Sequence, residues 1–358
     1  MIYCLNTRQK NNNTALGKAP ADISLIAKEY GAGEVIFYDP KQYRISGLTK
    51  VMAVVTGIKN WIRLARRVKK GDLVVVQHPY ENIRVAQRAI PMLKKKGVIF
   101  VSLIHDLPSL RKGMGERYTA FEEKRAKASD NALLREFDYI IAHNAAMVEY
   151  LVSEGFSRER MVSLEIFDYL SDQPMLSAQP KECSIVVAGN LEKGKCEYLY
   201  KLTDEDSGVV IHLFGREYKG NTDDNVIYHG QCAPDQLPGV LQGSFGLVWD
   251  GDAIETCGGN TGRYLRYNNP HKCSLYLASG LPVIIWKEAA LAAFVEGNSV
   301  GIAIGSLLEL KERIDTVSPE AYAQMRKNAA MIGQKLRAGY YTRRALDRIV
   351  SMAEVERG

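Results

Sequence analysis

FGLVWDGD at residues 245–252 and NNPHKCSLYLASGLPVIIW at residues 268–286 together predict a strand, a helix and a second strand. The runs at 245–249 and 282–286 are apolar almost throughout, as expected for parallel strands that are buried on both faces. Between them, Pro270 suits the first helical position, the Asn residues before it suit the N-cap, and Gly280 suits the C-terminal cap. This succession is the repeating unit of a doubly wound α/β sheet.

The same alternation continues along the rest of the chain, where short β-branched runs are separated by amphipathic stretches. The further predicted strands are residues 2–5, 34–38, 73–77, 98–104 and 139–143 in the first half, and 184–188, 209–214 and 225–228 in the second. Helical patterns occupy residues 53–69, 81–95 and 145–154 between them. Strands that alternate with helices in this way favour two doubly wound α/β sheets.

A polar segment at residues 168–181, DYLSDQPMLSAQPK, contains two prolines and has no clear period, so it marks the best domain boundary. At roughly 150 residues per domain, a chain of 358 residues suggests two domains. We expect a Rossmann-like first domain at 1–170, a Rossmann-like second domain at 182–333, and a cleft between them. The helical tail at 334–358 is expected to pack back on the first domain.

The composition is typical of a globular protein, because 46% of the residues are hydrophobic and 25% are charged. No apolar run reaches the ~18 residues of a membrane-spanning helix. The N-terminal residues MIYCLNTRQKNNN become polar too early for a signal peptide, so we expect a cytoplasmic protein. The net charge of +6 favours an anionic ligand or surface and is too small to indicate nucleic-acid binding.

Nothing in the cysteine pattern indicates a metal site. The six cysteines include no C-x-x-C pair, and the six histidines do not cluster with them in the sequence. Reduced, mostly buried thiols are therefore a better interpretation than a zinc site.

In open α/β sheets, ligands bind beyond the carboxyl ends of the strands, so the residues that follow each predicted strand deserve inspection. The loop at residues 6–17 has no G-x-G-x-x-G motif, which argues against a dinucleotide-dependent oxidoreductase. This polar, basic loop suits a sugar or a phosphate, or it is an ordinary surface loop.

Histidines end three of the predicted strands in the first domain. His105 and Asp106 follow the strand at 98–104, where they suit a general base with an orienting partner, or ligands for sugar hydroxyls. Alternatively, Asp106 caps the next turn and His105 packs beneath it. Because His78 and His143 end neighbouring strands, we favour a functional site at the rim of the expected cleft.

The second domain offers two candidate anion sites. The strand at 184–188 leads into Gly189, and Lys193 follows at the expected start of a helix, although the Walker A ending G-K-[ST] is absent. Further on, Lys272 falls in the first turn of the helix that begins at Pro270. Backbone N–H groups and an ammonium in that arrangement fit a diphosphate well.

The motifs at residues 246–252 and 264–284, together with IHDLPSLR at 104–111 and AGNLEK at 188–193, resemble those of a known group. This group is the GT-B glycosyltransferases of the bacterial β-1,6-galactofuranosyltransferase and serine-rich-repeat adhesin glucosyltransferase family. The resemblance covers most of the chain. It implies two Rossmann-like domains facing a cleft, a UDP-sugar held mainly by the second domain, and no catalytic metal or further cofactor.

The resemblance also implies roles for particular residues. Lys193, Asn269 and Lys272 would contact the phosphates and ribose of UDP. Tyr228 would lie near the uracil or ribose. Thr14, in the first loop, would reach the donor from the other domain.

Two further residues bear on the reaction. Asp106, with His105 beside it, is our candidate base from its position. Many GT-B enzymes have a ribose-binding Glu in the helix before the G-x-P-V turn, where this chain has Leu275, so ribose recognition must come from elsewhere.

Asp250 and Asp252 form a D-x-D motif, which holds a metal bound to a nucleotide diphosphate in some glycosyltransferases. Because this motif follows a strand in the second of two α/β domains, we favour another interpretation. In it, Asp250, Asp252 and Glu255 line the cleft, with Asp250 at the donor site, or they cap the Gly-rich turns around Gly258, and no metal is held.

The implied function is transfer of a hexose, glucose or galactofuranose, from a UDP-sugar to a hydroxyl of a glycan or glycosylated protein. A GT-B pseudoenzyme or accessory subunit that binds a UDP-sugar is the alternative. We expect a homo-oligomer without nucleic-acid partners. The basic stretch WIRLARRVKK at residues 61–70 is either a solvated helix face or a peripheral membrane contact.

Overall fold

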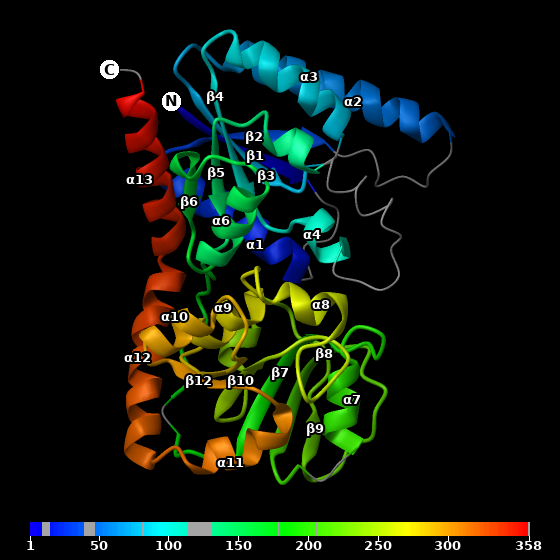
Figure 1. Ribbon diagram of the computed structural model, residues 1–358, viewed down its shortest axis with the longest axis vertical. Helices are drawn as coiled ribbons and strands as arrows, with labels where there is room; N and C mark the ends of the chain where they lie inside the picture. The colour runs from blue at the N-terminus through cyan, green and yellow to red at the C-terminus, as the bar shows by residue number, and fades with distance from the viewer. Residues whose placement is uncertain are drawn as a thin grey trace. The chain divides into compact units, whose positions relative to one another are not determined.

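The computed structural model describes residues 1–8, 15–38, 47–80, 82–113, 130–177, 179–204 and 207–356 (Figure 1). It forms two compact units, which are treated separately here. Unit 1 comprises residues 1–113, 117–164 and 342–358, and unit 2 comprises residues 165–341 together with 114–116. None of the described helices combines the length and hydropathy that crossing a bilayer requires.

Unit 1 contains a six-stranded sheet with the order β2-β1-β3-β4-β5-β6, in which every neighbouring pair is parallel. Its strands are β1 (Ile2–Arg8), β2 (Gly33–Tyr38), β3 (Leu73–His78), β4 (Ile99–Ile104), β5 (Tyr139–Ala142) and β6 (Met161–Ser163). The helices are α1 (Ala15–Glu29), α2 (Gly47–Arg67), α3 (Ile83–Lys94), α4 (Pro108–Gly113), α6 (Ala145–Ser153) and α13 (Tyr340–Val355). The strand order reverses between β1 and β3, so the carboxyl ends of these two strands form the switch point of a doubly wound sheet.

Helices cover both faces of this sheet. On one face, α2 and α3 contribute Trp61, Leu64 and Ile90 to a core that includes strand residues such as Phe37. The Trp61 ring lies edge-on to the ring of Phe37 with 5.5 Å between centroids. On the other face, Ala27 of α1 packs against β1. Core contacts on two faces explain why the strands of this unit read as continuous apolar runs.

The helix α13 comes late in the sequence but packs on unit 1. Arg343 donates to Glu29 with 2.6 Å between the guanidinium and the carboxylate, and Tyr30 donates to Asp347. Leu346 and Ile349 are buried. The predicted single tail helix at 334–358 is in fact two helices, because Gly339 takes a left-handed φ of 69° between α12 and α13 and ends the first of them.

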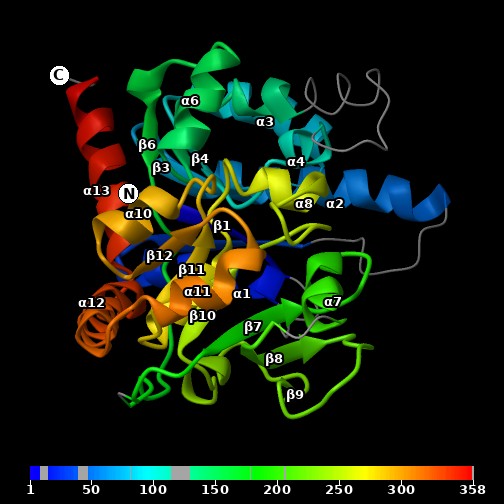
Figure 2. The ribbon, with the colours of Figure 1, turned by 60° about the horizontal axis from the view of Figure 1, so that its bottom comes forward.

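Unit 2 contains a second six-stranded parallel sheet with the order β12-β11-β10-β7-β8-β9 (Figure 2). Its strands are β7 (Ser184–Asn190), β8 (Val210–Arg216), β9 (Val226–Tyr228), β10 (Phe245–Val248), β11 (Val283–Trp286) and β12 (Gly301–Ile304). The helices are α7 (Glu197–Asp204), α8 (Gly259–Tyr264), α9 (His271–Ala278), α10 (Ala292–Gly297), α11 (Leu310–Asp315) and α12 (Pro319–Arg337). The order reverses between β7 and β10, so the carboxyl ends of these strands form the switch point.

The strand–helix–strand unit expected at residues 245–286 is β10, α9 and β11. The helix α9 lies so close to β10 that a Cβ added at Gly246 would stand 2.1 Å from the Tyr276 ring. The Tyr276 hydroxyl accepts the Ala188 N–H at 2.8 Å, so the same side chain also binds β7. Packing of α9 thus fixes the two strands of the switch point.

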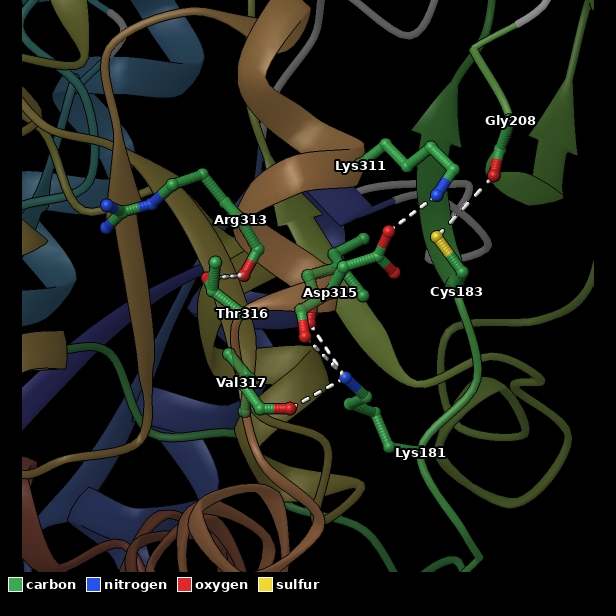
Figure 3. A network of polar contacts seen from close by, with 9 residues as sticks. Lys181, Cys183, Gly208, Lys311, Arg313, Asp315, Thr316 and Val317 are labelled. Carbon is green, nitrogen blue, oxygen red and sulfur yellow. Dashed lines mark hydrogen bonds and ion pairs between the residues drawn. The ribbon is translucent and has the colours of Figure 1, made fainter.

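One lysine anchors the segment that leads into β7 (Figure 3). The Lys181 ammonium donates to the carbonyls of Ile314 at 2.9 Å and Val317 at 2.6 Å, at the carboxyl end of α11. The last carbonyls of a helix have no partner inside it, and a cation there is favourable. Lys311 and Asp315, one turn apart on α11, form an ion pair at 2.5 Å.

Candidate functional site

The switch point of unit 2 has an open position at the end of β7. Gly189 has a φ of 138°, and no described atom lies within 4 Å of where its Cβ would stand. By contrast, a Cβ on Gly215 of β8 would stand 1.9 Å from the Gly189 carbonyl oxygen. The two glycines therefore bring the backbones together while leaving free space over the end of β7, where a ligand can approach the main chain.

A lysine ammonium lies at the end of β10. Lys272 is in the first turn of α9, and its Nζ donates to the Trp249 carbonyl at 2.8 Å. The same Nζ is 4.0 Å from Asp250 Oδ2, and both side chains are about one-fifth exposed. Pro270 is the N-cap of α9 and supplies no side-chain hydrogen bond. A cation beside helix N–H groups that lack a side-chain cap suits an anionic group.

Asn269, which precedes this helix, is 4% exposed. Its Nδ2 donates to the Glu165 carbonyl at 3.2 Å, within unit 2. Glu165 takes a left-handed φ of 74°. In the structure Asn269 thus holds the first residue of the unit, and the donor contact expected for it stays a prediction.

Lys193 and Tyr228 lie beyond β7 and at the end of β9. Lys193 is exposed, and its Nζ lies 5.6 Å from the centroid of the Tyr200 ring. The hydroxyl of Tyr228 donates to the Gly215 carbonyl at 2.8 Å, and its ring lies 5.5 Å from that of Tyr218. Tyr200 and Tyr218, whose rings lie next to these side chains, were not among the candidate residues predicted from the sequence. Their rings lie 5.4 Å apart and both are buried, so Tyr228, which is 38% exposed, is the ring of the three on which a base could stack.

The D-x-D motif packs against a glycine-rich turn. Asp250 Oδ1 accepts the N–H of Gly251 at 3.1 Å. The Asp252 carboxylate lies against the start of α8, where Cβ atoms on Gly258 and Gly259 would stand 2.3 and 3.0 Å from its oxygens. The structure thus places Asp252 against the glycine turn, and the donor contact expected for Asp250 stays a prediction. Within the described ranges, no three His, Cys, Asp or Glu side chains are grouped so that they could hold a metal ion.

In unit 1, His105 and Asp106 follow β4 as expected. His105 Nε2 lies 2.6 Å from Gln77 Oε1 of the neighbouring strand β3. Asp106 Oδ2 accepts from Arg111 at 2.9 Å. The other carboxylate oxygen of Asp106 is buried, with no hydrogen-bond partner among the residues that the structure describes. Thr14 lies outside the described residues.

The interpretation of His78 and His143 as rim residues was wrong. Both end strands as predicted, but each side chain is only 1% exposed. Burial lowers the pKa of His78 and of His143 to about 4, although the Asp106 carboxylate acts in the opposite direction on both and Asp130 on His78. At neutral pH both imidazoles are therefore uncharged and buried.

These pKa values predict that stability falls on mild acidification. The two histidines take up protons near pH 6.5 when unfolded but only near pH 4 when folded. Their contribution is complete above pH 6.5 and is lost as the pH falls towards 4. Between pH 7 and pH 5, each should lower the free energy of unfolding by about 2 kcal/mol, as measured by urea unfolding.

The variant His78→Leu removes one of these titrations and should reduce the pH dependence by the same amount. His212 and His229, whose pKa values are also lowered mainly by burial, stay in place in this comparison. An unchanged pH dependence in the variant would show that His78 does not titrate in this range.

Family models now identify the chain. The model for the N-terminal domain of glucosyltransferase 3-like proteins matches residues 1–166, and the model for their C-terminal domain matches residues 185–349. The chain belongs to the glucosyltransferase 3-like family. Membership confirms the resemblance found in the sequence and makes the chain a glycosyltransferase that moves a hexose.

Two members of this group were compared in sequence. The β-1,6-galactofuranosyltransferase WbbI of Escherichia coli K12 is 40% identical over 257 residues, which are 70% of this chain and 71% of WbbI. Glucosyltransferase 3 of Streptococcus gordonii is 26% identical over 332 residues, or 92% of each chain.

Solved structures show the same fold. The α,α-trehalose-phosphate synthase of Burkholderia vietnamiensis has a TM-score of 0.60 at 8% identity, with 98% of each chain covered. An α-glucosyltransferase solved in complex with UDP has a TM-score of 0.55 at 13% identity, covering 99% of this chain and 100% of that one. The chain thus has the GT-B fold that was expected from the sequence.

Proposed function

We propose that the chain transfers glucose or galactofuranose from a UDP-sugar to a hydroxyl of a glycan or glycosylated protein. The observation that carries this proposal is the Lys272 ammonium at the switch point of unit 2, beside the start of α9 and the end of β10. The relatives named galactofuranosyltransferase and glucosyltransferase suggest the two sugars, and the UDP-bound enzyme of the same fold supports UDP as the carrier.

In the proposed reaction, the acceptor oxygen bonds to the anomeric carbon while the bond from that carbon to the diphosphate oxygen breaks. Lys272 and Lys193 stabilise the negative charge that develops on UDP, the electrostatic contribution that usually dominates. Asp106 takes the acceptor proton. Gly189 lets the main chain of β7 approach the donor, Asp250 orients Lys272, and Tyr228 stacks near the uracil or ribose.

The same geometry supports a reaction without a metal. The ammonium of Lys272 already lies 4.0 Å from Asp250, where a cation bound to the D-x-D motif would have to compete with it. Asp252 is packed against Gly258 and Gly259. A fixed ammonium at the leaving group can supply the positive charge that a metal supplies elsewhere.

The test is a thermal-shift screen of the purified protein against UDP, UDP-glucose, UDP-galactofuranose, UDP-N-acetylglucosamine, GDP-mannose and NAD. A ligand present at about 100 times its Kd stabilises the fold by about 2.7 kcal/mol. We expect stabilisation by UDP and by one UDP-hexose, which names the donor. Stabilisation by NAD or GDP-mannose alone would contradict the proposal. The expected homo-oligomer stays a prediction, which light scattering on the same sample tests.

A further inference from the structure

The outward face of α2 is apolar along its length. Six large apolar side chains of this helix are 44% to 64% exposed, although they belong to a helix that packs on a core: Val51, Met52, Val54, Val55, Ile58 and Ile62. The spacing of 51, 55, 58 and 62 places four of them in one stripe. The opposite face is buried through Asn60, Trp61 and Leu64. The helix α2 therefore has one apolar face for the core of unit 1 and a second that faces away from it.

Single exposed apolar residues are ordinary, but a contiguous stripe marks an interaction surface. The neighbouring helix α3, which packs beside α2 (Figure 1), also has an exposed apolar side chain, Met92. We call the six exposed apolar side chains of α2 the α2 face. The charges around the α2 face indicate which kind of partner binds to it.

The α2 face lies in the most basic part of the chain. Residues 47–96 contain twelve Lys or Arg and only Asp72 and Glu81 as acidic residues, a net charge of +10. The whole chain has a net charge of +6, so the remaining residues together carry −4. The helix α2 itself has five basic residues and no acidic residue. Of these, Lys59 and Arg66 are exposed next to the apolar stripe.

We propose that the α2 face binds the surface of an anionic phospholipid membrane, with α2 lying in the plane of the interface. An interfacial helix combines an apolar face, which enters the boundary between headgroups and acyl chains, with Lys and Arg that attract anionic lipids. At 1.5 Å per residue, the 21 residues of α2 lie along about 30 Å of surface. Binding at this surface depends on neither the donor nor the acceptor proposed above.

A second copy of the chain is a poorer partner for this face. Symmetric dimers pair the same patch of two subunits, which would bring two segments of charge +10 together and cause repulsion. An anionic bilayer neutralises the same charges. Charge complementarity therefore favours the membrane.

The test is flotation of the full chain with vesicles of phosphatidylcholine and phosphatidylglycerol, and with vesicles of phosphatidylcholine alone. We expect binding to the anionic vesicles and weaker binding as salt shortens the range of the charges. The charge variant Lys59→Glu with Arg66→Glu should lower partitioning about thirtyfold or more. The apolar variant Ile58→Ser with Ile62→Ser should lower it about tenfold.

Matched controls come from α12 of unit 2, where Lys327 and Met331 are exposed. Lys327→Glu reverses one exposed charge and Met331→Ser replaces one exposed apolar side chain by serine outside the α2 face, and both should leave vesicle binding unchanged. Failure of the unmodified chain to float with anionic vesicles would overturn the proposal. Equal losses in the control variants would do the same. A change of molecular mass in the apolar variant, without vesicle binding by the parent chain, would assign the α2 face to a second copy instead.

Discussion

Replacement of Lys272 by alanine should lower kcat/KM by about 10²–10³-fold, the cost typical of losing one preorganised charge-stabilising donor. The ammonium is held by the Trp249 carbonyl beside the first turn of α9. It therefore needs little reorganisation when negative charge develops on UDP. Stabilisation by UDP in the thermal-shift assay should also be lost. A transfer assay with the donor identified by the screen measures the first effect.

Lys201 supplies the matched control. Its ammonium donates to the Asp252 carbonyl at 2.7 Å, in the same loop as the Trp249 carbonyl, but the side chain is exposed. Lys201→Ala therefore removes a similar contact to the loop without removing the charge at the end of β10, and we expect it to retain UDP binding. Equal losses in the two variants would mean that Lys272 acts by holding the loop rather than by contacting UDP.

Replacement of Asp106 by asparagine should lower kcat by about 10²–10⁴-fold while leaving UDP binding intact. The amide keeps the shape of the side chain but cannot take the proton of the acceptor hydroxyl. Separate measurements of kcat and of the UDP-dependent thermal shift distinguish the two roles. Transfer at the parent rate would show that another group is the base, and absence of transfer by the parent chain itself would indicate a binding protein with this fold.

Arg111→Gln provides the control for Asp106. It removes the ion pair to Asp106, at 2.9 Å in the structure, but keeps the carboxylate. We expect a small effect, because both side chains are partly exposed and such pairs contribute little. A loss as large as that of Asp106→Asn would assign Asp106 to holding the start of α4 in place.

The sequence predicted the sheets well wherever strands are buried on both faces. The strands predicted at 73–77, 98–104 and 282–286 correspond to β3, β4 and β11. Each is an apolar run between two helices, as expected for a parallel strand that is buried on both faces. The strands β6 and β12 were missed. Both lie at sheet edges and include partly buried residues, so they lack the fully buried run of strands such as β5, β10 and β11.

The ends of the predicted strands indicated where the candidate site lies, but the sequence did not indicate how deeply each side chain is buried. Within each sheet the parallel strands end at the same edge, which is why Gly189 and Lys272 in unit 2 and Asp106 in unit 1 could be selected from their places in the sequence. The same reasoning could not tell that His78 and His143 lie beneath the edge while Asp106 is partly exposed, because burial depends on the helices packed over each strand. Tyr218 was missed since it follows its strand in a loop without a motif.

The pairing of α13 with α1 bears on the order in which the chain acquires its structure during synthesis. Glu29 and Tyr30 belong to unit 1, yet their partners Arg343 and Asp347 emerge from the ribosome only after all of unit 2. Until then the surface that Leu346 and Ile349 will bury stays open to water. Unit 2 is continuous from residue 165 to 341 and lacks only the short segment 114–116. Unit 2 can therefore fold before unit 1 is complete, although most of unit 1 precedes it in the chain.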